Sequence, residues 1–397
     1  MPLQETRKAQ TTRGQRVKHP ESKTLSAIDI VLPLIVYKAF VYALIFLSLG
    51  LFPQFFDLNA YYANFHWPPG AKPEIKTMFA TWDAQMHLQL SYEGYKKDLP
   101  SLAHQPLWPA LIKLCSYLTF GNHLVASLVL ANVLSVAGFW LLFVLVRDDY
   151  GERVATTTSL LMLAFPGALF FSFPYTESLF LFLSALFFLF LKRGGYLVAA
   201  ALGFFMPLAR IVGVFCVFPF GWEIFSRERN HRKLLVYAVS PLLGILTSFF
   251  VVYLYTGEPL AAFGVQSRYV SQGSITKVFQ ISGFLSDIFR SVSFSHGVLD
   301  SAFDRIWFAW FVVTLPFIYI KNRTYFIYAL LMGLVPAMTQ SFMSYTRYVA
   351  VVFPMFIVTA ELFLKMKKQT WLWLTLAMLF SIQILFLLRH INFLWVA

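Results

Sequence analysis

Asp83 is the residue of this sequence whose setting most indicates a chemical site. It lies in the segment 79–109, directly after a Thr-Trp pair and beyond the first apolar run of membrane length. His87 follows four residues later, so on a helix the carboxylate and the imidazole would share one face. Asp83, His87 and His104 would form a partial ligand set, but without a second acid the pattern predicts no metal.

The composition places this site in an all-α polytopic membrane protein. Of the 397 residues, 58% are hydrophobic and only 13% are charged, far from the average of soluble proteins. The net charge of +13 comes from short basic clusters between apolar runs. Such clusters encode membrane topology, so we expect no nucleic-acid partner. Both cysteines lie in apolar runs and predict neither a disulfide framework nor a metal site.

The apolar runs and basic clusters predict an orientation. Residues 1–25 are polar and basic, typical of a disordered cytoplasmic tail, and residues 26–397 are expected to form one transmembrane domain. A first span over about 28–52 then places a long loop at about 53–105 outside the cytoplasm, and a second outer loop covers about 257–305. About eleven spans result, and the tail and short connectors that would be cytoplasmic hold most of the lysine and arginine residues.

On this topology, several polar residues fall at the outer ends of spans or in outer loops and could share one cavity: Asp83, Tyr175, Glu177, Arg210 and Arg347. Ionisable residues at membrane depth are costly and often functional. Glu177 and Arg210 could equally be interfacial, pairing with each other or with lipid headgroups, and Arg347 could be an interface anchor. No P-loop and no strand-linked GxGxxG occurs, so we expect a lipid substrate rather than a nucleotide.

Four segments resemble one enzyme family. Residues 81–95, TWDAQMHLQLSYEGY, are similar to a stretch of the PIG-V type mannosyltransferases, the glycosylphosphatidylinositol mannosyltransferase II family within the multi-spanning GT-C glycosyltransferases. Further matches follow in order at 165–184, 208–214 and 344–356, and the closing FLWVA resembles bacterial members. The chain departs from the family pattern at 104–109, HQPLWP, and the loop 257–305 has no counterpart.

The resemblance implies a GT-C-like bundle that transfers mannose from a polyprenyl-phosphate carrier to a lipid or glycan acceptor on the extracytoplasmic face, without a cofactor. Asp83 matches the acid expected to act as general base in one inverting displacement. Arg210 or Arg347 would bind the leaving phosphate. The other residues expected at the substrate are Trp82, which could instead be an interface tryptophan, and His87, Tyr175, Glu177 and Tyr348.

Two alternatives stay open. The enzyme could use another prenyl-linked sugar, such as glucose or arabinose. A lipid or solute transporter would also have many spans with polar residues, but it would place charges near the midplane and contain repeat-related halves. We expect the bacterial plasma membrane rather than the endoplasmic reticulum. The sequence leaves open the acceptor, the oligomeric state and which arginine contacts the phosphate.

Overall fold

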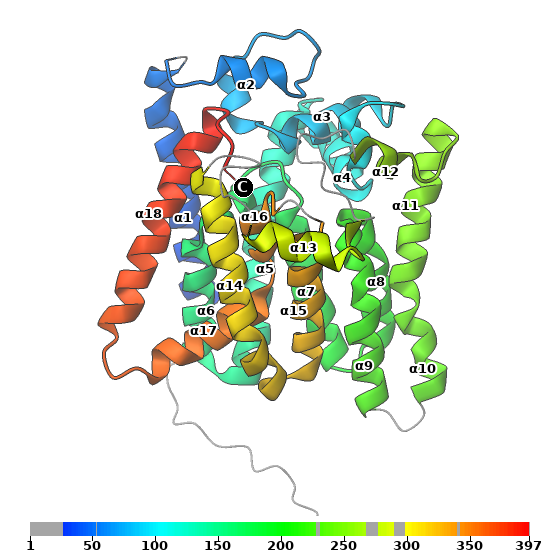
Figure 1. The fold of residues 1–397 in the computed structure, drawn as a ribbon, viewed down its shortest axis with the longest axis vertical. Coiled ribbons are helices and arrows are strands. Elements are labelled where there is room, and N and C mark those ends of the chain that lie inside the picture. Colours follow the sequence, from blue (N-terminus) through cyan, green and yellow to red (C-terminus); the bar gives the residue numbers. More distant parts are fainter. Residues whose placement is uncertain are drawn as a thin grey trace, which may run out of the picture.

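The computed structural model describes most of the chain: residues 27–52, 54–227, 231–266, 277–289, 298–339 and 342–396. The tail predicted over residues 1–25 lies outside these ranges. Within them the chain is helical and contains no strand. Upright helices form a bundle, and shorter helices lie across one end of it (Figure 1).

The upright helices carry most of the predicted spans. They are α1 (Ala27–Ser48), α5 (His123–Tyr150), α6 (Glu152–Ala164), α7 (Glu177–Lys192), α8 (Tyr196–Ala209), α9 (Val217–Arg227), α10 (His231–Ala238), α11 (Ser240–Thr256), α14 (Val298–Lys321), α15 (Arg323–Ala337), α17 (Phe353–Lys365) and α18 (Thr370–Ile391).

The predicted outer loops also contain helices. Over 53–105 these are α2 (Leu58–Ala63), η2 (Ile75–Phe79), α3 (Asp83–Glu93) and η3 (Pro100–Ala103); over 257–305 they are α12 (Ala261–Gln266), α13 (Ile281–Phe289) and the start of α14. The remaining short helices are η1 (Leu49–Leu51), α4 (Leu107–Ser116), η4 (Tyr117–Thr119), η5 (Pro166–Ser172), η6 (Ile211–Cys216) and α16 (Tyr345–Val349).

Among the residues that the structure describes, five helices are long and apolar enough to cross a membrane, and a sixth span arises if α6 and η5, bent by 85°, are taken as one. The predicted count of about eleven therefore stays a prediction. The difference has a physical reason, because several predicted spans are shorter helices interrupted by irregular backbone. Residues 196–225, for example, form α8, then the 3₁₀ segment η6, then α9.

Small residues let neighbouring helices pack closely, α5 against α7 and α8 against α11. A Cβ at Gly138 of α5 would lie 3.1 Å from the backbone nitrogen of Phe182, and one at Gly244 of α11 would lie 2.1 Å from the carbonyl oxygen of Phe204. Such close approaches stabilise helix pairs in membranes through van der Waals contact.

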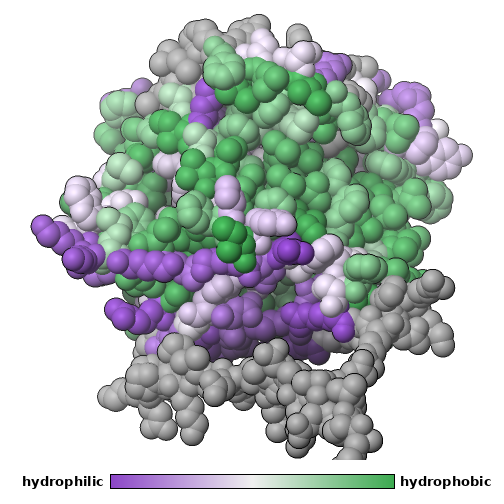
Figure 2. All heavy atoms as spheres, turned by 60° about the horizontal axis from the view of Figure 1, so that its bottom comes forward, coloured by the Kyte–Doolittle hydropathy of each residue, from purple (hydrophilic) through white to green (hydrophobic). Residues whose placement is uncertain are grey.

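Surface hydropathy differs between the sides of the bundle and one of its ends. Figure 2 shows hydrophobic residues over the sides of the bundle and hydrophilic residues gathered across the end that lies at the bottom of Figure 1. The connectors with Lys192 and Arg193 and with Lys365, Lys367 and Lys368 belong to that end, and all of these basic residues except the partly buried Lys192 are exposed. The opposite end holds the short helices α2, α3, α4 and α12, and it is the end that the sequence predicts to be extracytoplasmic.

Candidate active site

Asp83 is the first residue of α3, where a negative charge suits the positive end of the helix dipole. The residue before it, Trp82, has φ of +51°, a left-handed conformation that is strained for a bulky side chain. The Trp82 indole stacks on Phe393 with ring centroids 4.5 Å apart, and Trp395 packs against it edge-on at 4.8 Å. The Trp82 ring, which the resemblance places at the substrate, is thus in contact with Phe393 and Trp395 of the C-terminal segment 392–396.

Tyr175 and Glu177 lie where the chain passes from η5 into α7. The Tyr175 hydroxyl donates to the carbonyl oxygen of Thr81 at 2.9 Å, which ties this segment to the turn before Asp83. Glu177 begins α7 and is fully buried. Both residues therefore lie at the end of the bundle where α3 begins.

Two arginines complete a continuous network. Arg347, on α16, donates through Nη1 to Asp83 Oδ2 at 2.5 Å and through Nε to Glu177 Oε1. Its guanidinium lies 4.7 Å from the centre of the Tyr175 ring. Arg210, at the end of α8, donates to the same Glu177 oxygen at 2.8 Å and lies over the Tyr348 ring at 4.8 Å.

The structure thus brings together the polar residues that the sequence predicts to converge. Glu177 and Arg210 do pair with each other, as an interfacial pair would. However, the exposed fractions of their side chains are only 0% and 6%, and the network continues through Arg347 to Asp83. Residues of α3, α7 and α16, together with Arg210 directly after α8, therefore form one buried ionic cluster of two carboxylates and two guanidinium groups, in which Glu177 contacts both arginines and Asp83 contacts Arg347.

Two histidines lie beside this cluster, in the part of the chain between the spans α1 and α5. His87 is buried one turn after Asp83, and its ring meets that of partly exposed His104 at 4.5 Å in an edge-to-face contact. Burial, reinforced by His104, holds the pKa of His87 well below its usual value, and burial also lowers the pKa of His104. Both rings are therefore neutral near pH 7.

The carboxyl group of Asp83 is held in its charged form. Burial acts to raise its pKa, but the charge and hydrogen bond of Arg347 lower it, and the net result is a pKa well below the usual value for aspartate. Across the described ranges, no three His, Cys, Asp or Glu side chains are placed to hold a metal ion.

The C-terminal segment closes the space above Asp83. A cavity of about 10 Å³, room for about one water molecule, is lined by Trp82, Asp83, Phe170, Tyr175, Arg347, His390, Trp395 and Val396. His390 is fixed by a 2.8 Å hydrogen bond between its Nε2 and the Thr81 hydroxyl. A sugar can therefore reach Asp83 only if these side chains shift.

Sequence reasoning missed residues that support the cluster. Asp304 of α14 accepts from the backbone nitrogen of Thr346 at 2.7 Å and from its hydroxyl at 2.6 Å, which fixes the residue before Arg347. Lys38 of α1 donates to the carbonyl oxygen of Phe171 at 2.6 Å. A lysine inside an apolar run was a visible signal, whereas Asp304 looked like one more acid of a polar loop.

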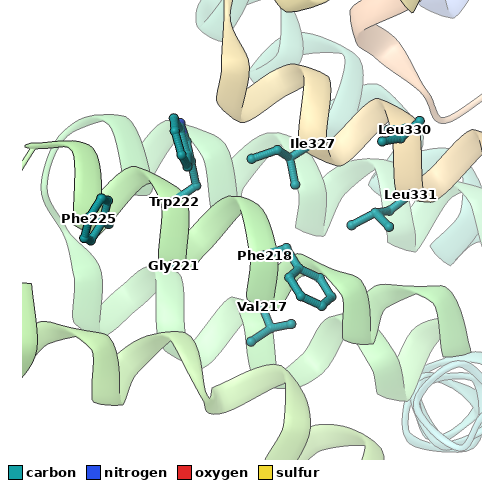
Figure 3. Close-up of a pocket in the computed structure, with 8 residues that line it drawn as sticks. All are labelled: Val217, Phe218, Gly221, Trp222, Phe225, Ile327, Leu330 and Leu331. Atoms are coloured by element: carbon teal, nitrogen blue, oxygen red, sulfur yellow. The ribbon is translucent and has the colours of Figure 1, made fainter.

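An apolar groove lies between α9 and α15 (Figure 3). It has a volume of about 570 Å³ and is lined by Val217, Phe218, Gly221, Trp222, Phe225, Ile327, Leu330 and Leu331. Both of its helices connect to the ionic cluster: α9 follows Arg210 through η6, and α15 precedes α16 with Arg347.

Comparisons with known proteins give little beyond this geometry. No protein-family model and no curated protein matches the chain. Similar solved structures include three of an oligosaccharyltransferase from Archaeoglobus fulgidus: a complex with Zn and sulfate (11% identity, 93% of this chain, 53% of that chain, TM-score 0.45), one with an inhibitory peptide and a dolichol-phosphate (10%, 94%, 56%, 0.46), and one tethered to an acceptor peptide (11%, 94%, 55%, 0.46). The chain spans about half the length of these structures, and at these TM-scores the likeness assigns neither family nor function.

Proposed function

We propose that this chain is a membrane glycosyltransferase that moves a mannosyl residue from a polyprenyl-phosphate carrier to a lipid or glycan acceptor at the extracytoplasmic face. The observation that carries the proposal is the ionic cluster, in which Arg347 contacts Asp83 directly and shares Glu177 with Arg210. Transfer from a prenyl phosphate needs a base for the acceptor hydroxyl and positive charge for the leaving phosphate, and the cluster contains both.

In the proposed reaction, Asp83 takes the proton of the acceptor hydroxyl while that oxygen attacks the anomeric carbon. Prenyl phosphate leaves from the opposite side, so the configuration at that carbon inverts. Arg347 and Arg210 present planar guanidinium groups that can each donate two hydrogen bonds to phosphate oxygens. Glu177 orients both arginines. Tyr175 supports the face of Arg347, as Tyr348 does for Arg210.

A lipid donor also suits the groove between α9 and α15. Its lining is almost wholly apolar, and its two helices lead to Arg210 and Arg347. An isoprenoid chain lying there would place its phosphate toward the arginines. The choice of mannose rests on the PIG-V-like segments. Segment 104–109, which departs from the family pattern, leads from η3 into α4 and lies outside the ionic cluster, so we expect it to bear on acceptor choice more than on the displacement.

The test is transfer by purified protein reconstituted in vesicles, with radiolabelled polyprenyl-phosphate mannose and a total lipid extract as acceptor. We expect the wild type to label a lipid or glycan product and Asp83→Asn to label none. Asp98→Asn is a matched control, because Asp98 is an exposed acid of the same loop with φ of +68°, a conformation that asparagine tolerates. Transfer from prenyl-linked glucose or arabinose alone would replace mannose but keep the class, whereas no transfer from any prenyl-linked sugar would refute it.

A further inference from the structure

Both guanidinium groups that the proposed function assigns to the phosphate are already paired with carboxylates. Arg347 contacts Asp83 and Glu177, and Arg210 contacts Glu177. Two carboxylates and two guanidinium groups leave the cluster without net charge. A phosphate that enters it must therefore compete with a carboxylate for donors, because a buried anion without charge or hydrogen-bond partners is strongly destabilised.

The geometry indicates which carboxylate gives way. Glu177 is fully buried and receives hydrogen bonds from both arginines through one oxygen. Asp83 has a single hydrogen-bonding partner among the described side chains, Arg347 Nη1, and its own side chain is 22% exposed. Asp83 also lines the small cavity, which continues to Trp395 and Val396. Moving Asp83 thus breaks one contact at the edge of a cavity that has room for about one water molecule, whereas moving Glu177 breaks two contacts in a closed core.

We propose that Arg347 is a donor-operated switch on Asp83. In the free protein the guanidinium holds the carboxylate in an ion pair, and the donor phosphate takes its place on Nη1 and releases Asp83 toward the acceptor. The inference rests on the proposed function and adds an order to it: the donor binds first, and the base becomes active only when the phosphate is in place. An acceptor alone, including water, then meets a carboxylate that is still paired.

The electrostatics of the site support this order. Arg347 is the cation in contact with Asp83, and its pull keeps the pKa of that carboxyl below its usual value, which makes it a weak base. Releasing the contact raises the basicity. The other titratable or charged groups that face Asp83 come from its own helix and from the elements packed around it: His87, His104, Tyr175, Glu177, Arg210 and His390.

The charges balance through the transfer step. The O–H bond of the acceptor breaks and its proton goes to Asp83, while a bond forms between that oxygen and the anomeric carbon. The bond from the anomeric carbon to the phosphate oxygen breaks, and its electron pair stays on the prenyl phosphate. One negative charge is thus lost at Asp83 and one appears on the phosphate, and both groups lie within reach of Arg347. Release of prenyl phosphate and of the proton restores the original pair.

The experiment measures binding without turnover. The probe is farnesyl methyl phosphate, a phosphodiester that carries a prenyl chain, has no sugar to transfer and does not titrate near neutral pH. Calorimetry in two buffers of different ionisation enthalpy at about pH 4.5, near the ordinary pKa of an aspartate, gives both the affinity and the number of protons taken up. The proteins compared are the wild type, Asp83→Asn and the control Asp98→Asn.

We expect the wild type to take up a fraction of one proton on binding, because the released carboxylate becomes more basic. Asp83→Asn should bind the diester about threefold or more tightly, because the competing carboxylate is gone, and should take up no proton. Asp98→Asn should behave like the wild type. If Asp83→Asn still takes up a proton on binding, the proton goes to the histidines and the switch is overturned. Equal or weaker affinity of that variant for the diester would also overturn it.

The outcomes also separate this inference from the proposed function. Binding of the diester by the wild type without proton uptake would overturn the switch and leave a prenyl-phosphate site standing. No binding to any of the three proteins would overturn both. A wild type that binds the diester without taking up a proton overturns the switch even if Asp83→Asn folds poorly, whereas assigning an observed uptake to Asp83 requires that variant.

Discussion

Arg347→Lys is the substitution that most directly tests the chemistry assigned to the cluster. The arginine uses two different nitrogen atoms, Nε toward Glu177 and Nη1 toward Asp83, and its flat face covers the Tyr175 ring. A lysine keeps the positive charge but has one nitrogen at the end of a flexible chain. It can satisfy one carboxylate or the phosphate, but it cannot reproduce the planar arrangement that reaches several of them.

The expected effect follows from the hydrogen bond that is lost. A hydrogen bond to a charged group contributes about 1.5–3 kcal/mol. If the lost bond is one that the leaving phosphate receives in the transition state, the rate falls roughly 10- to 150-fold, since each 1.36 kcal/mol is tenfold. If Arg347 only anchored the chain at a membrane interface, we would expect almost no change in rate.

The assay is single-turnover transfer with the donor bound before the acceptor is added, so that product release does not limit the rate. Thermal unfolding of the same sample shows whether the fold is intact. Arg193→Lys is the control, because Arg193 is an exposed arginine of a connector that pairs with Asp148 at 3.5 Å. A rate for Arg347→Lys within threefold of the wild type, in a stable protein, would refute the phosphate role of this arginine.

Three further substitutions test the support of the cluster. Glu177→Gln leaves both arginines facing one carboxylate, so we expect a loss of about 3–5 kcal/mol in unfolding free energy, and an unchanged melting temperature would contradict this. Asp304→Ala removes the acceptor that holds Thr346 and should slow transfer about tenfold or more, a cost of about 1–3 kcal/mol. Asp304→Asn keeps an acceptor and should keep most of the rate. Equal rates in the wild type and both variants would exclude this positioning role. Burial holds the pKa of His87 well below its usual value, so only the unfolded chain gains a proton there as pH falls below about 6.5, and stability drops by about 1.4 kcal/mol per pH unit until the folded pKa is reached. His87→Gln should therefore flatten the dependence of melting temperature on pH between about 6.5 and 5. An identical slope in the variant would show that His87 is already charged in the folded protein.

Much of the cluster could be predicted from the sequence because ionisable residues in apolar surroundings are few and conspicuous. Asp83, Glu177, Arg210 and Arg347 each interrupt an apolar or aromatic stretch, and the topology places all of them at one end of the bundle. Their pairing could not be predicted in detail. Arg347 contacts a residue 264 positions away in the chain, and which nitrogen meets which oxygen depends on the packing of α3, α7 and α16.

The supporting contacts were harder to predict, because many of them involve the backbone. Thr346 is held by a carboxylate on α14 through its own backbone nitrogen, and no residue type signals that in advance. Helix lengths were also hard to predict. Apolar composition continues through η5 and η6, so hydropathy alone cannot show where a span stops and irregular backbone begins.

Those interruptions explain why the cluster lies where it does. Irregular backbone inside a membrane protein is tolerated where the protein itself satisfies the free polar groups. Between α6 and α7, Lys38 donates to the carbonyl oxygen of Phe171 and Tyr42 donates to that of Ser172, so two side chains of α1 stabilise the end of η5. This segment in return places Tyr175 and Glu177 at the beginning of α7, where they meet Arg347. The same backbone break therefore links two buried residues. Its carbonyl groups need a donor such as Lys38 of α1, and it places Glu177 of α7 in contact with the arginines.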